Sequence, residues 1–163
     1  MFWKLINPIT IAIANSFLHG LISANIIVLY FKGVKTGKDY AIPVSYLENP
    51  EGRLSCVTDR PFIWWRNLVN IEKIKLLYKG NLIEAEVDIE VDDNKLIADQ
   101  LEALCLHSRI DGLFAEVGYK NGKPIRKDVE KTAGKMTLIQ LRIDKPQTYC
   151  FLSWDIQLIQ RMR

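Results

Sequence analysis

The chain has 163 residues, of which 48% are hydrophobic and 25% are charged. That length supports one hydrophobic core and is short for two, so we expect a single domain over residues 1–163. Lys and Arg number 22 against 19 Asp and Glu, a net charge of +3 without any long block of one sign. This balance argues against a nucleic-acid-binding protein.

The three cysteines, Cys56, Cys105 and Cys150, are odd in number and unrelated in spacing. They therefore predict neither a disulfide framework nor a zinc motif, and they fit a reducing cytoplasm. His19 and His107 have no carboxylate at ligand spacing, so we expect no metal site.

Both ends of the chain are apolar. Polar residues interrupt residues 1–31 before any run approaches the roughly 20 residues of a membrane-spanning helix, and no secretory signal is evident. We expect residues 1–24 to form short helices that cover the domain, with loose docking at the inner membrane face as the alternative. The tail at residues 146–163 is expected to pack on the same domain or on a second copy in a homodimer.

Runs of β-branched and aromatic residues predict strands at 26–31, 40–47 and 54–58, with turns at 33–38 and 49–52. The run at 73–91 predicts a hairpin whose loop is Gly80-Asn81, with Gly80 at positive φ. This register pairs Ile74 with Val87, Leu76 with Ala85, Tyr78 with Ile83, Lys73 with Asp88 and Lys75 with Glu86. Apolar residues then share one face, and opposite charges pair across the other.

The second half of the chain begins with a helix capped by Asp92 or Asp93 and running to about Leu106. A further helical turn at 109–117, a Gly- and Lys-rich loop at 118–127 and a last strand at 136–143 follow. We expect a mainly β (α+β) fold, an antiparallel split β-barrel with flanking helices. No G-x-G-x-x-G motif follows a strand, which disfavours a Rossmann nicotinamide site.

Three features could carry chemistry. The turn at 32–38 places glycines, Thr36 and lysines so that loop amides, a hydroxyl and positive charge could hold a phosphate, although such turns often serve only as soluble turns. Pro43 lies inside a strand and is typical of an edge or a bulge, where backbone could contact a flat ligand.

The third feature is the segment 59–68, which predicts a short helix capped by Asp59 with Pro61 in its first turn. Trp64 with Leu68, and Trp65 with Val69, have i, i+4 spacing, so one pair should face the core. The other tryptophan could wall a ring-binding cleft beside Arg66 and Asn67, or both could simply be packed. No Ser/His/Asp or Cys/His constellation is evident, so any reaction would depend on a cofactor.

These features in this order resemble the deazaflavin-dependent nitroreductases and quinone reductases of the split β-barrel flavin-binding superfamily. The resemblance covers residues 7–143 and is carried by the segments 17–23, 33–38, 43–46 and 64–68. It implies a cofactor, the deazaflavin F420 or FMN, that passes hydride to a quinone, a nitro compound or a similar small electron-poor acceptor.

The resemblance also implies roles for individual residues. Lys35, Thr36, Gly37 and Lys38 would hold the phosphate, Pro43 and Val44 would contact the ring, Thr58, Asp59, Trp64 and Asn67 would complete the cleft, and Tyr119 would face the substrate. Val34 stands where the family usually has arginine. Two alternatives remain: a barrel that binds a flavin, a tetrapyrrole or a lipid without turnover, and a membrane-surface or interface protein with a vestigial cleft.

Overall fold

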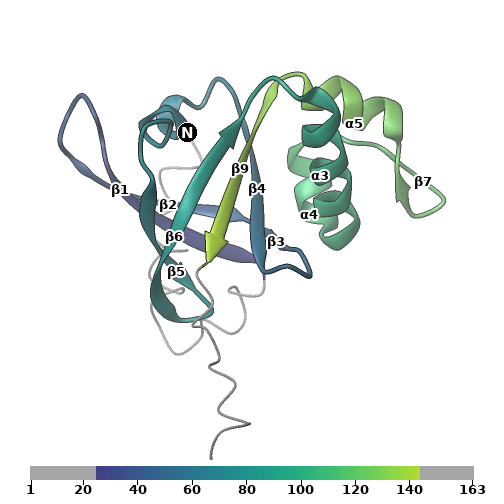
Figure 1. The fold of residues 1–163 in the computed structure, drawn as a ribbon. Coiled ribbons are helices and arrows are strands. Elements are labelled where there is room, and N and C mark those ends of the chain that lie inside the picture. Colours follow the sequence, from purple (N-terminus) through teal and green to yellow (C-terminus); the bar gives the residue numbers. More distant parts are fainter. Residues whose placement is uncertain (1–24, 144–163) are drawn as a thin grey trace, which may run out of the picture.

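The computed structural model describes residues 25–143 (Figure 1). The helices expected within residues 1–24 and the tail expected at 146–163 lie outside these residues. Within the described part of the chain, no helix is long and apolar enough to cross a membrane.

The main element is an antiparallel sheet of seven strands. They run, in chain order, β1 (Ile26–Lys32), β2 (Asp39–Ser45), β3 (Leu47–Glu48), β4 (Arg53–Asp59), β5 (Lys73–Tyr78), β6 (Asn81–Glu90) and β9 (Met136–Ile143). Their order across the sheet is β2-β1-β5-β6-β9-β4-β3. The sheet curls on itself into a half-barrel with helices beside it, which confirms the predicted split-barrel class (Figure 1).

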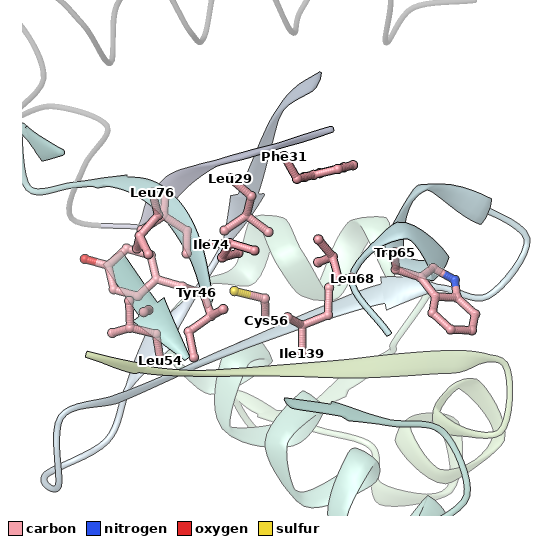
Figure 2. Packing of buried hydrophobic residues seen from close by; sticks show 13 residues of the cluster. Leu29, Phe31, Tyr46, Leu54, Cys56, Trp65, Leu68, Ile74, Leu76 and Ile139 are labelled. Carbon is pink, nitrogen blue, oxygen red and sulfur yellow. The ribbon is translucent and has the colours of Figure 1, made fainter. Parts of the chain in front are cut away.

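The two faces of the sheet pack against separate clusters because strand side chains alternate between faces. The inner cluster fills the curl and includes Leu29, Leu54 and Ile139, none of which is exposed (Figure 2). The outer cluster joins Leu138 of β9 to Ile97 and Leu101 of a covering helix. Strand β9 therefore contributes to both clusters.

Three helices follow the sheet's sixth strand: α3 (Asn94–His107), α4 (Arg109–Phe114) and α5 (Arg126–Ala133). The predicted cap of α3 is confirmed, since the Asp93 carboxylate accepts the Leu96 N–H at 2.8 Å. The segment expected as a loop at 118–127 instead contains a small hairpin, β7 (Tyr119–Lys120) and β8 (Lys123–Pro124), and the start of α5. Helix α5 was not predicted.

The β5–β6 hairpin is confirmed, but its predicted register is wrong by two residues. Lys79 and Gly80 form the loop, with φ of 48° and 79°, and Asn81 pairs with Tyr78. Ile74 consequently faces Ala85 instead of Val87, and Lys75 faces Glu84 instead of Glu86. A shift of two residues leaves every side chain on its face, so alternation alone does not distinguish the two registers.

The predicted capped helix after β4 is also corrected. The segment is a 3-10 helix, η1 (Ile63–Asn67), that begins after Pro61, and Asp59 makes no side-chain cap. Asp59 is instead the last residue of β4, and its carbonyl accepts the Phe62 N–H in a turn. Because a 3-10 helix has three residues per turn, Trp65 shares its buried face with Leu68, whereas Val69 is exposed.

Candidate functional site

The loop between β1 and β2 is the first part of the candidate site. Its base is closed by the Gly33 N–H, which donates to the Lys38 carbonyl at 2.9 Å, and by an ion pair of 2.6 Å between Lys32 and Asp39. Gly37 adopts a φ of 64°, a left-handed conformation that favours glycine. The sequence thus folds the loop into a tight turn at the free end of the hairpin.

Most backbone N–H groups of this loop already donate hydrogen bonds to acceptors within the chain. Those of Thr36 and Gly37 donate to the Gly33 carbonyl, and that of Lys38 donates to the Thr36 hydroxyl oxygen at 3.3 Å. The Val34 N–H donates to the Asn67 Oδ1 at 3.0 Å. Among the described residues, only the Lys35 N–H of the loop has no such acceptor, so the expected convergence of several amides on one anion is wrong.

The side chains of the loop remain available to an anion. Lys35 and Lys38 are exposed, and the Thr36 hydroxyl accepts the Lys38 N–H while its own hydrogen can still donate. Val34 is 71% exposed and adds an apolar surface at the tip. The loop therefore fits a phosphate through two ammonium groups and a hydroxyl, and not through a backbone nest.

Asn67 joins this loop to the helix η1. Its Oδ1 accepts the Val34 N–H, and its Nδ2 donates to the Trp64 carbonyl at 2.8 Å. Residues that lie 33 positions apart in the sequence are thereby brought into direct contact. The structure places the predicted phosphate loop beside the predicted tryptophan segment.

An aromatic stack lies next to this junction. The Phe31 ring stacks on Tyr40 at a centroid distance of 5.6 Å and on Trp64 at 6.1 Å, with interplanar angles of 16° and 24°. Phe31 lies between the other two rings and is a buried member of the inner cluster, whose packing is drawn in Figure 2. Trp65 is anchored separately, since its indole Nε1 donates to the Arg60 carbonyl at 3.2 Å.

Phe31 and Tyr40 were not predicted as site residues. They are direct cross-strand partners in the β1–β2 hairpin, so a register counted outward from the turn would have paired them. Both rings were assigned only to strands because the sequence gives no sign that Trp64, from a distant segment, completes their stack.

Pro43 and Val44 lie on β2, which is an edge strand as expected for Pro43. Val44 packs on the inner cluster together with Ile42, and alternation places Pro43 on the other face with Ala41. The two residues therefore present different faces, and only Val44 shares the inner face with Phe31.

Thr58 and Asp59 end strand β4, and alternation likewise separates them. Thr58 follows Leu54 and Cys56 on the inner face, whereas Asp59 lies on the face of Val57, which packs in the outer cluster. Partial burial, with a smaller contribution from the charge of Glu116, raises the pKa of Asp59 above its ordinary value. The inner face thus gathers Val44 and Thr58 with Phe31.

Tyr119 lies far from this region. It is on β7, in the hairpin at the end of the molecule opposite the β1–β2 loop (Figure 1). Its hydroxyl donates to the Cys105 carbonyl at 2.8 Å, and the Arg109 guanidinium lies 5.7 Å from its ring centroid. Within one chain, the structure does not bring Tyr119 together with the other predicted site residues.

A separate groove of about 480 Å³ lies over strands β4, β6 and β9. Its lining is rich in charged side chains of both signs, among them Arg53, Lys73, Glu86 and Arg142. None of the predicted site residues lines it.

Comparison with known proteins adds a fold to this geometry. No protein-family model and no curated protein matches the sequence. A provisionally named 5-nitroimidazole antibiotic resistance protein from Bacteroides thetaiotaomicron superposes with a TM-score of 0.52 at 10% identity, covering 78% of each chain.

Two further solved structures are similar in the same way. A pyridoxamine 5'-phosphate oxidase-related, FMN-binding protein from Nostoc punctiforme gives a TM-score of 0.50 at 14% identity, covering 83% of this chain and 78% of its own. A structure described as a domain-swapped dimer gives 0.50 at 12% identity, covering 86% and 97%. At these identities the comparisons show the fold: the chain has the split-barrel architecture of the pyridoxamine 5'-phosphate oxidase-like proteins.

Proposed function

We propose that the protein binds a flavin-type cofactor at the junction of the β1–β2 loop and η1, and that it passes hydride from the reduced cofactor to an electron-poor acceptor such as a quinone or a nitro compound. The observation that carries this proposal is the 3.0 Å hydrogen bond from Val34 to Asn67, which holds a lysine-bearing loop against Trp64. The FMN-binding Nostoc protein, which has the same fold, supports the choice of cofactor.

The phosphate end of the cofactor would be held by Lys35, Lys38 and Thr36, with Gly37 shaping the turn. Both lysines are exposed, and both carry compact charges on flexible stems. Such charges bind a phosphate without fixed bidentate geometry, and salt screens them. The affinity is therefore expected to be moderate and to depend on ionic strength.

The ring of the cofactor would lie against Val44 and Trp64, with Thr58 on the same inner face. Pro43 and Asp59 lie on the opposite faces of their strands and would not line this cleft. When bound, the cofactor supplies the hydride itself. The residues of the chain would orient the ring, exclude water and select the acceptor. The aromatic stack of Phe31, Tyr40 and Trp64 offers a flat, rigid wall for that purpose.

FMN matches the charge of the β1–β2 loop better than the deazaflavin F420 does. Of the three lysines in the segment 32–38, Lys32 is paired with Asp39. Among the described residues, Lys35 and Lys38 are in no ion pair, so two positive charges remain available to a phosphate. The tip of the loop is the apolar side chain of Val34, which is 71% exposed. This charge suits one phosphate group better than the longer anionic tail of the deazaflavin F420.

A barrel that binds a flavin, a tetrapyrrole or a lipid without turnover is the second candidate. The position of Tyr119 favours it, because the predicted substrate-facing phenol donates to the Cys105 carbonyl in the outer cluster. A homodimer in which a second copy completes the cleft would restore the first candidate. Exposed Phe62 and Ile63, at 47% and 67%, offer apolar surface for such a contact beside the cleft.

A cofactor titration tests the proposal. The purified full chain is titrated with FMN and with F420, and binding is followed by absorbance and by the quenching of cofactor fluorescence. We expect FMN to bind at micromolar concentration and the double variant Lys35→Ala/Lys38→Ala to bind at least about tenfold more weakly, since two charge-assisted contacts are lost.

The matched control is Lys120→Ala/Lys123→Ala, which removes two exposed lysines that flank a similar tight turn in the β7–β8 hairpin. This control should leave FMN affinity unchanged. If neither FMN nor F420 binds, the proposed function is refuted. If the two double variants bind FMN with equal affinity, the assignment of Lys35 and Lys38 to the phosphate is refuted. Oxidation of bound, reduced FMN by a quinone separates a reductase from a binding protein.

A further inference from the structure

Asn67 uses both ends of its carboxamide within the chain. The oxygen accepts from Val34 at 3.0 Å and the nitrogen donates to the Trp64 carbonyl at 2.8 Å. An asparagine amide has two donors and an oxygen with two lone pairs, so these bonds set its orientation. The side chain is thus oriented by two backbone groups of the protein itself.

In the described part of the chain, the bond from Val34 to Asn67 is the only hydrogen bond between this loop and η1. The remaining hydrogen bonds and the ion pair of the segment 32–39 all join residues of that segment to one another or continue the β1–β2 ladder. A free hairpin tip that carries exposed lysines is mobile unless something ties it down. The contact between Val34 and Asn67 is the tie that the structure provides.

We propose that Asn67 is a positioning residue, a latch that fixes the loop tip on η1 so that Lys35 and Lys38 keep a constant place relative to Trp64. In this assignment its carboxamide does not contact the cofactor, in contrast to the cleft-lining role that the family resemblance implied. The effect on binding rests on the proposed function, whereas the latch itself is a property of the chain alone.

Substitutions of Asn67 differ in which of its two hydrogen bonds they keep. Asn67→Leu keeps a similar volume and removes both hydrogen bonds. Asn67→Asp keeps an acceptor for the Val34 N–H but cannot donate to the Trp64 carbonyl at neutral pH, and it adds a negative charge beside the lysines. Asn70→Leu, an exposed asparagine one turn further along, serves as the matched control.

Amide hydrogen exchange of the full chain, measured by NMR, tests the latch without any cofactor. The Lys35 N–H, which has no acceptor among the described residues, is the internal reference. In the wild type we expect the Val34 N–H to be protected at least about tenfold relative to Lys35, because only the former is hydrogen-bonded. That protection should vanish in Asn67→Leu and persist in Asn67→Asp and Asn70→Leu.

Equal protection of Val34 and Lys35 in the wild type would overturn the latch, and this comparison needs no variant to fold. Val34 protection that survives in a folded Asn67→Leu variant would overturn it as well. A wild type that shows the protection but binds neither FMN nor F420 would confirm the latch and refute the proposed function instead.

FMN titration at several salt concentrations separates positioning from direct contact. The latch lowers the entropic cost of ordering the loop when the cofactor binds. Asn67→Leu removes that advantage and should weaken FMN binding several-fold while leaving the salt dependence unchanged. Lys35→Ala/Lys38→Ala should reduce that dependence, since the charges themselves are gone. Unchanged FMN affinity in Asn67→Leu, or a shallower salt dependence, would contradict the positioning role.

Discussion

Asp59 shows how a residue at the end of a strand can cost stability. Its carboxyl group is partly buried on the outer face, and this burial, together with the charge of Glu116, raises its pKa. A raised pKa in the folded state means that folding favours the protonated form, so stability is fully present below the pKa of the unfolded chain and falls as pH rises through the folded value.

Asp59→Asn is therefore expected to raise the unfolding temperature slightly at pH 7, where the wild-type carboxyl is charged. The gain should shrink as pH is lowered toward 4, because the wild-type carboxyl then takes up its proton. Thermal unfolding at both pH values checks this, with exposed Asp92→Asn as the control. A gain that is the same at both pH values would show that charge is not the cause.

At the scale of elements, the loop of the β5–β6 hairpin depends on two residues at positive φ. Lys79 at 48° and Gly80 at 79° match the conformation that joins two antiparallel strands with the fewest residues. Gly80→Ala adds a Cβ where such a φ is strained, and we expect a loss of about 1 kcal/mol in the free energy of unfolding.

Urea unfolding measures this loss. Gly134→Ala is the matched control, because Gly134 has a φ of −60° at the end of α5 and its Cβ would meet only ordinary contacts. The control should change the free energy of unfolding by less than about 0.5 kcal/mol. Similar losses in the two variants would mean that the turn does not impose the strain.

This hairpin also shows how far sequence reasoning could go. Alternation and charge pairing predicted the two strands and their faces, but they are unchanged by a shift of two residues. The observed register brings two residues at its turn to β3, where the Tyr78 hydroxyl and the Lys79 ammonium both donate to Glu48, at 2.7 and 2.9 Å. Long-range contacts of this kind are not visible in a local pattern.

The candidate site was predictable to a similar degree. The loop, the edge strand and the tryptophan segment were each identified from local residue types, and the structure places the loop beside the helix. The hydrogen bond that the Val34 N–H donates to Asn67 was not predictable, because Asn67 lies in a distant segment of the sequence. Tyr119 was assigned by resemblance, and its hydroxyl bond to Cys105 in the outer cluster has no local signature.

At the scale of the whole molecule, the inner and outer clusters share strands β4 and β9. Ile139 belongs to the inner cluster, its neighbour Leu138 to the outer one, and neither is exposed. The two clusters are therefore expected to unfold together, although one lies within the curled sheet and the other beneath the helices.

Leu138→Ala tests this coupling. Removing a buried leucine side chain should lower the free energy of unfolding by about 2–5 kcal/mol. Tryptophan fluorescence and helical circular dichroism should shift to the same new denaturant midpoint. Leu113→Ala, at a side chain that is 76% exposed on α4, is the control and should change little. Two separate midpoints in Leu138→Ala would show that the clusters are independent.

Pro43 has a consequence for the behaviour of this sheet in a crowded solution. The Gly33 bond to Lys38 sets the ladder so that Pro43, opposite Val28, lies at a position whose nitrogen points away from β1 toward the open edge. Proline thus costs the ladder nothing and removes a donor from the edge strand β2. A strand from another molecule would find no hydrogen-bond donor at this position, which disfavours edge-to-edge pairing and aggregation of the sheet.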